Sequence, residues 1–289
     1  MVILGSTGML GQALMNIAKS NNIKVTGVAR SNADINLDIV DFDKLTLFLR
    51  KKKPKIIINC IAITDINLCE NDTELAYQVN AYLVSVLVDT CRELDIYLIH
   101  ISTDHFFVDD GSEKHDEESH VVLVNNYAKT KYKGEGFALS YDKSLVIRTN
   151  IVGFRNQKKP TFIEWVLSSL QDDKEITLFQ DFFTSSIDVE NLSKIIFKII
   201  TESHIFGLFN IASSEVFNKA EFITKFAHRF GFEKSNFNLG SVKSINGVKR
   251  AESLGLDVSK IEKLTNSTMP TTDEVIESLY DKKKGICLK

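Results

Sequence analysis

Two side chains four residues apart, Tyr127 and Lys131, could together deliver a proton to a substrate. On a helix, residues i and i+4 lie on the same face, so the phenol and the ammonium group can point into one site. The pKa of a free tyrosine is about 10, and a nearby ammonium group lowers it by favouring the phenolate. A tyrosine tuned in this way can protonate a carbonyl oxygen while a hydride reaches the carbon. The pair therefore predicts a general acid for carbonyl reduction.

The same spacing also occurs at Tyr280 and Lys284, so the pattern alone is not specific. That second pair lies in a charged terminal segment with no strand predicted beside it. Tyr127 instead opens a predicted helix downstream of a strand that leads into Thr103. Because ligands bind at the carboxyl ends of strands in an open α/β sheet, we expect Thr103 to donate a hydrogen bond to the same carbonyl oxygen.

A cluster of glycines follows the first apolar run, where residues 2–11 read VILGSTGMLG. Gly5 permits a tight turn, Gly8 lets the backbone approach a pyrophosphate, and Gly11 lets helix and strand pack closely. The unpaired N–H groups at the start of the following helix favour phosphate binding. A purely structural turn is the alternative, but the position in a strand–turn–helix unit favours a dinucleotide cofactor. The predicted contacts in this loop are Gly5, Thr7, Gly8, Met9, Leu10 and Gly11.

The residue after the second predicted strand bears on the choice of cofactor. An acidic residue there would favour NAD by binding the ribose 2′-hydroxyl. This chain has Arg30 instead, which can pair with a 2′-phosphate through two N–H groups, so NADP is favoured and NAD stays possible. The alternative is an arginine that is simply exposed at a strand end.

The elements that must position these residues alternate between strand and helix from residue 1 to about 150. Strands are predicted at 2–4, 24–29, 55–62, 97–102 and 144–148, with helices at 9–18, 42–51, 74–94 and 127–140. This alternation predicts an α/β fold, namely a Rossmann-type doubly wound parallel sheet. We expect a cofactor domain over 1–150, rejoined by about 177–210. A smaller C-terminal α/β substrate lobe would then comprise 151–176 and 211–289.

Composition excludes several other classes of protein. The 289 residues are 44% hydrophobic and 25% charged, with a net charge of −3, so neither disorder nor nucleic-acid binding is indicated. No apolar run approaches the ~20 residues of a membrane span.

No CxxC pair is present, which favours reduced thiols and a cytoplasmic protein. No metal site is predicted, because the polar run HDEESH at 115–120 is typical of a solvated loop. The four cysteines are Cys60, Cys69, Cys91 and Cys287.

Taken together, these motifs resemble the extended short-chain dehydrogenases/reductases. Further stretches are similar to the dTDP-4-dehydrorhamnose reductase-like (RmlD-like) branch of that superfamily. They cover nearly the whole chain and include INCIAITDINLCE at 58–70, HISTDHFF at 100–107, NNYAKTKYKGE at 125–135, LVIRTNIVG at 145–153, FGLFNIASSE at 206–215 and SLGLDVSKIE at 253–262.

The resemblance implies NADPH- or NADH-dependent reduction of a nucleotide-linked 4-keto-6-deoxy sugar, for cell-surface polysaccharide biosynthesis. It implies a catalytic triad of Thr103, Tyr127 and Lys131. A homodimer is possible. By the same resemblance, the cofactor would be contacted by Asp38, Ile39, Cys60, Ile61, Ala62, Tyr127 and Lys131, and Lys131 would hold the nicotinamide ribose. Asp104, His105 and Phe106 would face the sugar together with Thr103.

Departures from the family pattern leave alternatives open. His105 stands where a tyrosine is usual, and no glutamate follows Asp104, which disfavours dehydration. A nucleotide-sugar epimerase of the same superfamily is one alternative. Another is a cofactor-binding regulatory subunit without catalysis, like that of methionine adenosyltransferase. The identities of the sugar and of the nucleotide remain open at this point.

Overall fold

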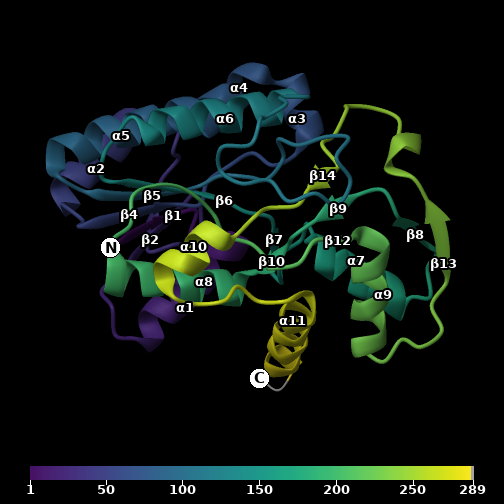
Figure 1. Cartoon of the computed structure of the whole chain (residues 1–289). Coiled ribbons are helices and arrows are strands. Elements are labelled where there is room, and N and C mark those ends of the chain that lie inside the picture. Colours follow the sequence, from purple (N-terminus) through teal and green to yellow (C-terminus); the bar gives the residue numbers. More distant parts are fainter. Residues whose placement is uncertain (288–289) are drawn as a thin grey trace.

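A seven-stranded sheet forms the centre of the molecule in the computed structural model, which describes residues 1–287 (Figure 1). All its strand pairs are parallel, as the predicted doubly wound fold requires. Five of the strands lie in the predicted places because their apolar residues are buried on both faces of the sheet. In spatial order the strands are β11 (Gly207–Asn210), β6 (Ser144–Arg148), β5 (Tyr97–Ile101), β4 (Ile56–Asn59), β1 (Val2–Leu4), β2 (Thr26–Ala29) and β3 (Ile35–Asn36).

Helices cover both faces of this sheet (Figure 1). Helices α1 and α8 pack against each other on one face. On the opposite face, α5 contacts both α2 and α6. This arrangement confirms the predicted Rossmann-type architecture. The bounds are α1 (Met9–Ser20) and α8 (Val189–Lys198) on the first face, and α2 (Phe42–Lys52), α5 (Leu83–Leu94) and α6 (Asn126–Leu139) on the second.

The order of the strands places the functional edge. The strand β1 lies between β2 and β4, so the direction in which the chain adds strands reverses at β1. Ligands bind in the crevice at the carboxyl ends of the strands beside such a switch point. The glycine loop after β1 and the segments after β4 and β5 all open onto this edge.

A smaller lobe is built around three short sheets and its own hydrophobic core (Figure 1). Helices α7 (Phe162–Gln171) and α9 (Lys219–Arg229) both begin with capping boxes, formed at Thr161 and Asn218. The paired strands are β7 (Ile151–Val152) with β10 (Ile187–Asp188), β8 (Ile176–Phe179) with β13 (Phe237–Gly240), and β9 (Phe183–Thr184) with β12 (Phe217–Asn218) and β14 (Ser253–Leu254).

Shorter helical elements connect these layers, and the last long helix closes the described chain. Two of them are π-helical turns, η1 and η2, which extend neighbouring α-helices. The set comprises α3 (Ile66–Asn71), α4 (Thr73–Tyr77), η1 (Gln78–Tyr82), η2 (Ile199–Ser203), η3 (Val242–Ser244), α10 (Ser259–Thr265) and α11 (Thr272–Cys287).

The boundaries between the two parts differ from the expected ones. The expected return to the cofactor domain begins at about 177, but β8 and β9 belong to the small sheets. The chain instead rejoins the main layers at α8, which packs on α1, and at β11. Residues near α10 also return, since Leu256, Val258 and Ile261 lie in the core beneath the main sheet. Short strands pair with partners distant in sequence, so local patterns do not assign them to a lobe.

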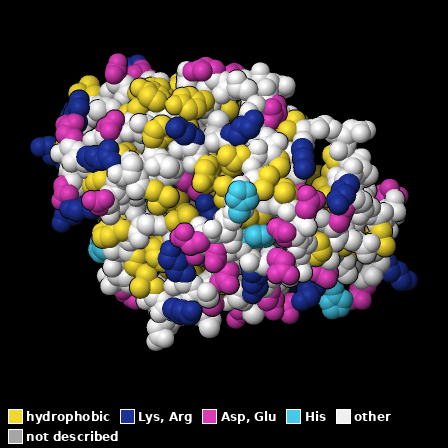
Figure 2. Space-filling view, turned by 45° about the horizontal axis from the view of Figure 1, so that its top comes forward, with side chains coloured by type: hydrophobic (Ala, Val, Ile, Leu, Met, Phe, Trp, Pro, Cys, Tyr) yellow, Lys and Arg dark blue, Asp and Glu magenta, His cyan; other side chains and the backbone are white. Residues whose placement is uncertain are grey.

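The surface carries charges of both signs. Figure 2 shows lysine and arginine side chains interspersed with aspartate and glutamate over the face that it presents. None of the helices within residues 1–287 is long and apolar enough to cross a membrane.

Candidate active site and cofactor cleft

The turn after β1 has the shape that its glycines predict. Gly5 has a φ of +80°, which side-chain-bearing residues rarely adopt, and its N–H donates to the carbonyl of Val28 at 2.8 Å. A Cβ at Gly11 would lie 2.1 Å from the carbonyl oxygen of Gly5, so only glycine allows α1 to start this close to the turn. Gly8 occupies the N-cap of α1, where no side chain covers the first N–H groups of the helix.

This turn forms one wall of a cleft of about 750 Å³. The size lies in the range of small-molecule and cofactor sites. The other walls come from the ends of β2 and β4 and from a segment of the smaller lobe. Among the predicted cofactor contacts, those that line the cleft are Gly5, Thr7, Gly8, Arg30, Ile39, Cys60, Ile61 and Ala62.

Six predicted contacts do not line the cleft, and two of these, Tyr127 and Lys131, belong to the group described below. Leu10 and Gly11 are buried beneath the turn and support it. Met9 lies on the side of α1 that faces Gly153. Asp38 is exposed, and its carboxylate accepts a hydrogen bond from the Val40 N–H. Leu10 and Gly11 are the second and third residues of α1, which turns them toward the core.

A basic segment that the sequence analysis missed closes the cleft. Residues 155–159 read RNQKK and line it opposite the glycine turn. Gln157 donates from Nε2 to the Thr7 carbonyl at 3.0 Å, and Lys159 pairs with Asp65 at 3.1 Å. The segment therefore spans the cleft from the end of β1 to the residues after β4. A run with three cations between Gly153 and Pro160 is the signal that could have found it.

The cleft fits a nicotinamide dinucleotide. The turn has no Cβ at the closest approaches, and a Cβ at Gly8 would lie 3.2 Å from the Gly5 carbonyl oxygen. Free N–H groups at the start of α1 and cations on the opposite wall suit a pyrophosphate. Arg30 is exposed at the rim, where it can reach a phosphate on the adenosine ribose.

The structure brings Thr103, Tyr127 and Lys131 together. Helix α6 begins at Asn126, where the Asn125 side chain caps it by accepting from the Ala128 N–H at 2.8 Å. Tyr127 and Lys131 then lie on the buried face of the helix. The Thr103 hydroxyl, just beyond β5, contacts the phenol of Tyr127.

A second contact fixes the start of α6. Glu70 of α3 accepts from the Asn126 backbone N–H at 2.6 Å and from its side-chain amide at 2.7 Å. The carboxylate also lies at the positive end of the α6 dipole, which favours it. The helix that carries the phenol is thus held at its first residue.

The electrostatics of Tyr127 differ from the expectation. Burial raises the pKa of Tyr127, and contact with Thr103 opposes this shift only in part. The expected lowering by Lys131 does not accompany this shift. The Lys131 ammonium group donates to the Ile101 carbonyl at 2.7 Å. Burial lowers the pKa of Lys131 to about 8. Tyr127 is therefore a protonated phenol at neutral pH.

A chain of hydrogen bonds extends from Thr103 into the smaller lobe. Asp104 lies 3.4 Å from the Thr103 hydroxyl and accepts from the Asn150 amide at 2.8 Å. Ser186 in turn donates to Asn150 at 2.6 Å, and Thr184 lies 3.1 Å from Ser186. Burial raises the pKa of Asp104 to about 7.

His105 lies beside the phenol with a fixed tautomer. Its ring centre is 5.6 Å from that of Tyr127. The Ala251 N–H donates to Nε2 at 3.4 Å, so Nε2 carries no proton. Burial and the charge of Arg250 lower the pKa of His105 to about 4. His105 is therefore a neutral imidazole whose proton is on Nδ1.

Phe106 does not face the sugar site as expected. Its side chain is 0% exposed and lies in the core, with the Arg148 guanidinium 5.2 Å from its ring centre. Arg148 itself pairs with buried Glu135 of α6 at 2.9 Å. The strand end turns at Asp104, and this turn directs Phe106 inward.

Asn80 is a further residue that sequence reasoning did not single out. It lies in the π-helical turn η1, is 0% exposed, and holds the Ile63 backbone through both its amide N–H and carbonyl groups. The same side chain donates to Thr130 of α6 at 3.2 Å. Asn80 therefore connects the segment after β4 to the helix that bears Tyr127. π-Helical turns are frequent at functional sites.

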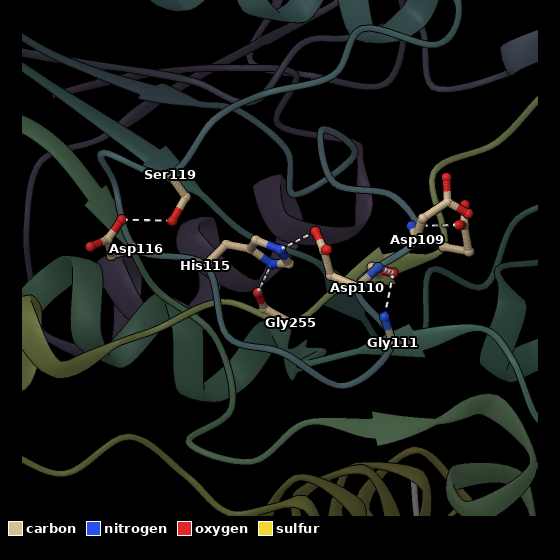
Figure 3. Close-up of polar contacts among 9 residues, drawn as sticks. Asp109, Asp110, Gly111, His115, Asp116, Ser119 and Gly255 are labelled. Carbon is tan, nitrogen blue, oxygen red and sulfur yellow. Dashed lines mark hydrogen bonds and ion pairs between the residues drawn. The ribbon is translucent and has the colours of Figure 1, made fainter.

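The loop between Thr103 and α6 folds onto residues 252–257 (Figure 3). The His115 ring stacks on Phe107, with centres 3.9 Å apart. Its Nδ1 donates to the Gly255 carbonyl at 2.9 Å, and its Nε2 lies 3.3 Å from the Asp110 carboxylate (Figure 3). This packing orders the loop that follows Thr103.

The prediction that residues 115–120 form a solvated loop is therefore wrong for two of them. His115 is buried as described, and Glu117 is buried with its carboxylate accepting from the Asn210 N–H at 2.8 Å. Asp116, Glu118 and His120 are exposed, as a solvated loop requires. No group of three or more His, Cys, Asp or Glu side chains in the described chain could hold a metal ion.

The cysteines are dispersed. Cys60, Cys69 and Cys91 are free thiols, and burial raises the pKa of Cys60 to about 12. The side chain of Cys287 lies outside the described residues.

A comparison of the whole chain with known families decides where it belongs. The profile of the family described as "RmlD substrate binding domain" matches residues 1–284. The chain belongs to this family. A solved structure from Sulfolobus tokodaii, described as a hypothetical dTDP-4-dehydrorhamnose reductase, is 31% identical to this RmlD-family chain. It superposes with a TM-score of 0.80 over 91% of this chain and 93% of the other.

Other relatives of this RmlD-family chain are more distant. A dTDP-4-dehydrorhamnose reductase from Bacillus anthracis, solved in complex with NADP, is 23% identical with a TM-score of 0.87, covering 97% and 98% of the two chains. A probable low-salt glycan biosynthesis reductase from Haloferax volcanii is 23% identical over 96% of each chain. Methionine adenosyltransferase 2 subunit beta of Xenopus laevis is 26% identical over 91% of this chain and 81% of its own.

Proposed function

We propose that this chain reduces a nucleotide-linked 4-keto-6-deoxy sugar with a nicotinamide cofactor. The observation that carries the proposal is the meeting of Thr103, Tyr127 and Lys131 at the carboxyl edge of the sheet. They lie in a chain whose glycine turn borders a dinucleotide-sized cleft. Membership of the RmlD family and relatives described as dTDP-sugar and glycan biosynthesis reductases support the same reaction.

Tyr127, Thr103 and Lys131 each have a separate role in the reduction of the ketone. NADPH, when bound, supplies the hydride that reaches the carbonyl carbon. The Tyr127 phenol, kept protonated by burial, gives its proton to the carbonyl oxygen, so the ketone becomes a hydroxyl group. The Thr103 hydroxyl orients that oxygen, and the Lys131 ammonium stabilises the phenolate left on Tyr127.

The cleft supports NADPH as the preferred cofactor, with NADH as a second substrate. Arg30 and the cations of 155–159 surround the cleft, whereas no acidic side chain lines it. A 2′-phosphate gains from positive charge, while a 2′-hydroxyl is recognised by a carboxylate. Leu10 and Gly11 support the glycine turn from beneath rather than contact the cofactor.

We further propose a cytoplasmic enzyme of cell-surface polysaccharide biosynthesis that can act as a homodimer. Free thiols at the three described cysteines suit a reducing compartment. Cell fractionation and sedimentation of the purified chain test these two points separately from catalysis.

The direct test follows NADPH absorbance after addition of dTDP-, UDP-, GDP- and CDP-linked 4-keto sugars. We expect stoichiometric oxidation with at least one of them. No oxidation with any member of the set contradicts the proposal. An epimerase, in contrast, returns the hydride to its substrate and consumes no NADPH overall.

A second candidate is a non-catalytic regulatory subunit, favoured by the similarity to methionine adenosyltransferase 2 subunit beta. Such a protein would bind the cofactor and copurify with an enzyme in fixed ratio, without turnover of any sugar. The presence of Thr103, Tyr127 and Lys131 in one site favours the reductase.

A further inference from the structure

The first turn of a helix depends on partners from outside the helix, and Tyr127 lies in the first turn of α6. The first four backbone N–H groups of a helix have no acceptor within it. In α6 the Asn125 side chain satisfies the N–H of Ala128. The N–H of Asn126, directly before Tyr127, needs an acceptor from another element. Because Asn126 and Tyr127 are adjacent, a displacement of one moves the other.

Glu70 of α3 supplies this acceptor through both of its carboxylate oxygens. Its Oε1 accepts from the Asn126 backbone N–H at 2.6 Å, and its Oε2 accepts from the Asn126 side-chain amide at 2.7 Å. Two hydrogen bonds from one planar carboxylate fix the orientation of Asn126 as well as its position. The sequence gives no sign of this contact, since Glu70 and Asn126 are 56 residues apart.

Helix α3 is itself anchored beside the cofactor cleft. The Asp65 side chain caps its first turn. Cys69 is buried, and its thiol donates to the Ile63 carbonyl at 3.6 Å. The backbone of Ile63 is held in turn by the amide of Asn80. Glu70 therefore projects from a fixed element, so its carboxylate can serve as a reference point for α6.

Helices α3 and α4 also lie against α6 through an apolar contact with the tyrosine ring (Figure 1). The cluster comprises Tyr127, Cys69 and Ala76, with Ile63 and Ile66 packed against it. Apolar contacts are non-directional, so they exclude water from the ring without fixing the direction of its hydroxyl group. The directional restraint on this turn comes from the hydrogen bonds of Glu70.

We propose that Glu70 is a positioning residue that holds the Tyr127 phenol in place for proton transfer to the substrate carbonyl oxygen. This inference rests on the proposed function. A proton donor must lie within hydrogen-bond reach of its acceptor, and a displacement of about 1 Å can cost about 10²-fold in rate. Glu70 does not line the cofactor cleft, so its effect reaches the reaction through Tyr127.

The other contacts of the site do not depend on Glu70. Lys131 lies one turn further along α6 and is held by the Ile101 carbonyl at 2.7 Å. The glycine turn is formed by residues after β1 and is supported by α1. Loss of Glu70 should therefore lower kcat while the affinity for NADPH is kept. A residue with a purely structural role would instead lower the melting temperature with kcat unchanged.

The experiment measures kcat, KM and NADPH affinity of the full chain with the 4-keto sugar that it reduces. Glu70→Ala is expected to lower kcat by about 10- to 100-fold, with NADPH affinity within about twofold of the wild type. Glu70→Gln keeps an acceptor for the Asn126 N–H and should recover part of the loss. Glu74→Ala removes an exposed carboxylate from the neighbouring helix α4 and is the matched control, in which neither value should change.

A double variant shows whether Glu70 acts through Tyr127. In a Tyr127→Phe chain the proton donor is already absent, so Glu70→Ala should lower kcat little further. Hydrogen exchange of the amides of residues 126–128 gives a readout that is independent of turnover. It should be faster in Glu70→Ala than in the wild type, because the first turn of α6 has lost its anchor. The melting temperature confirms that each variant is folded under the assay conditions.

Three results would overturn the inference. They are an unchanged kcat in Glu70→Ala, a loss in the double variant that equals the sum of the two single losses in free energy, and a loss of NADPH affinity as large as the loss of kcat. If the wild type turns over no 4-keto sugar, the proposed function fails, and hydrogen exchange then decides the inference separately. Equal exchange at 126–128 in Glu70→Ala and the wild type overturns it.

Discussion

The Nζ atom of Lys131 lies 2.7 Å from the carbonyl oxygen of Ile101, the last residue of β5. This contact connects α6 to the strand that leads into Thr103. It also occupies one of the three N–H groups of the ammonium, so two remain for the cofactor and the phenol.

The first prediction concerns pH. With a pKa of about 8, Lys131 is charged below that pH and loses its proton above it. Since the raised pKa of Tyr127 keeps the phenol protonated there, kcat/KM should fall as pH rises through about 8. Lys131→Arg, which stays charged, should remove this alkaline limb even if the rate is lower. Lys129→Met, an exposed neighbour, should keep it. An unchanged limb in Lys131→Arg argues against the assignment.

The second prediction tests the proton donor. Tyr127→Phe should lower turnover by at least ~10²-fold, the contribution expected of a general acid. NADPH affinity, measured by fluorescence titration, should be little changed. The control is Tyr280→Phe, which alters the other tyrosine with a lysine four residues later. Tyr280 lies on α11, with its ring against Arg229 of α9. Equal activity of Tyr127→Phe and the wild type would show that another group donates the proton.

The third prediction compares two helical glycines. Gly11→Ala places a methyl group where the Gly5 carbonyl oxygen is 2.1 Å away, so the turn must move and cofactor affinity should fall by at least ~10-fold. Gly136→Ala meets no atom within 4 Å and should instead stabilise α6 by about 0.5–1 kcal/mol. Thermal unfolding and NADPH titration of both variants provide the comparison. Retained NADPH affinity in Gly11→Ala would be inconsistent with the tight turn.

The fourth prediction concerns cofactor choice. Arg30→Ala should weaken NADPH binding about tenfold and leave NADH binding nearly unchanged, since only NADPH has the 2′-phosphate. The preference for NADPH should also shrink with added salt, because Arg30 is exposed. Lys24→Ala, outside the cleft, serves as a control for net charge. Equal losses for both cofactors would place Arg30 elsewhere than at the 2′-phosphate.

The fifth prediction uses the buried carboxyl group of Asp104. Its pKa is raised to about 7 in the folded chain, so the folded state holds the proton more tightly than the unfolded state. The resulting stabilisation is present at low pH and is lost as pH rises through 7. From pH 5 to 8, Asp104→Asn should therefore gain about 2–3 kcal/mol relative to the wild type. Urea unfolding at several pH values measures this, and parallel curves would refute it.

The Rossmann-type sheet could be predicted because its apolar runs and glycine turn are local signals. Thr103, Tyr127 and Lys131 were selected in the same way, from helix spacing and the position of a strand end, and their joint role stays a prediction. The inward direction of Phe106 could not be predicted, since it depends on the turn at Asp104 and on Arg148 from β6.

Other features depend on contacts between distant segments. The burial of His115 requires Gly255, and the anchoring of Asn126 requires Glu70 of α3. The pKa of Tyr127 was predicted to fall but is raised, because spacing shows that a lysine is near but not how deeply the phenol is buried. The periodicity of apolar residues along the chain does not show which distant segments come into contact.

The last strand of the main sheet, β11, has a consequence for how the protein is made. It pairs with β6 but is synthesised only after a large part of the smaller lobe has left the ribosome. At 5–20 residues per second, the edge of β6 stays unpaired for several seconds. An open apolar edge recruits strands from other chains, so a nascent chain stalled before residue 207 should be a target for chaperones or for aggregation.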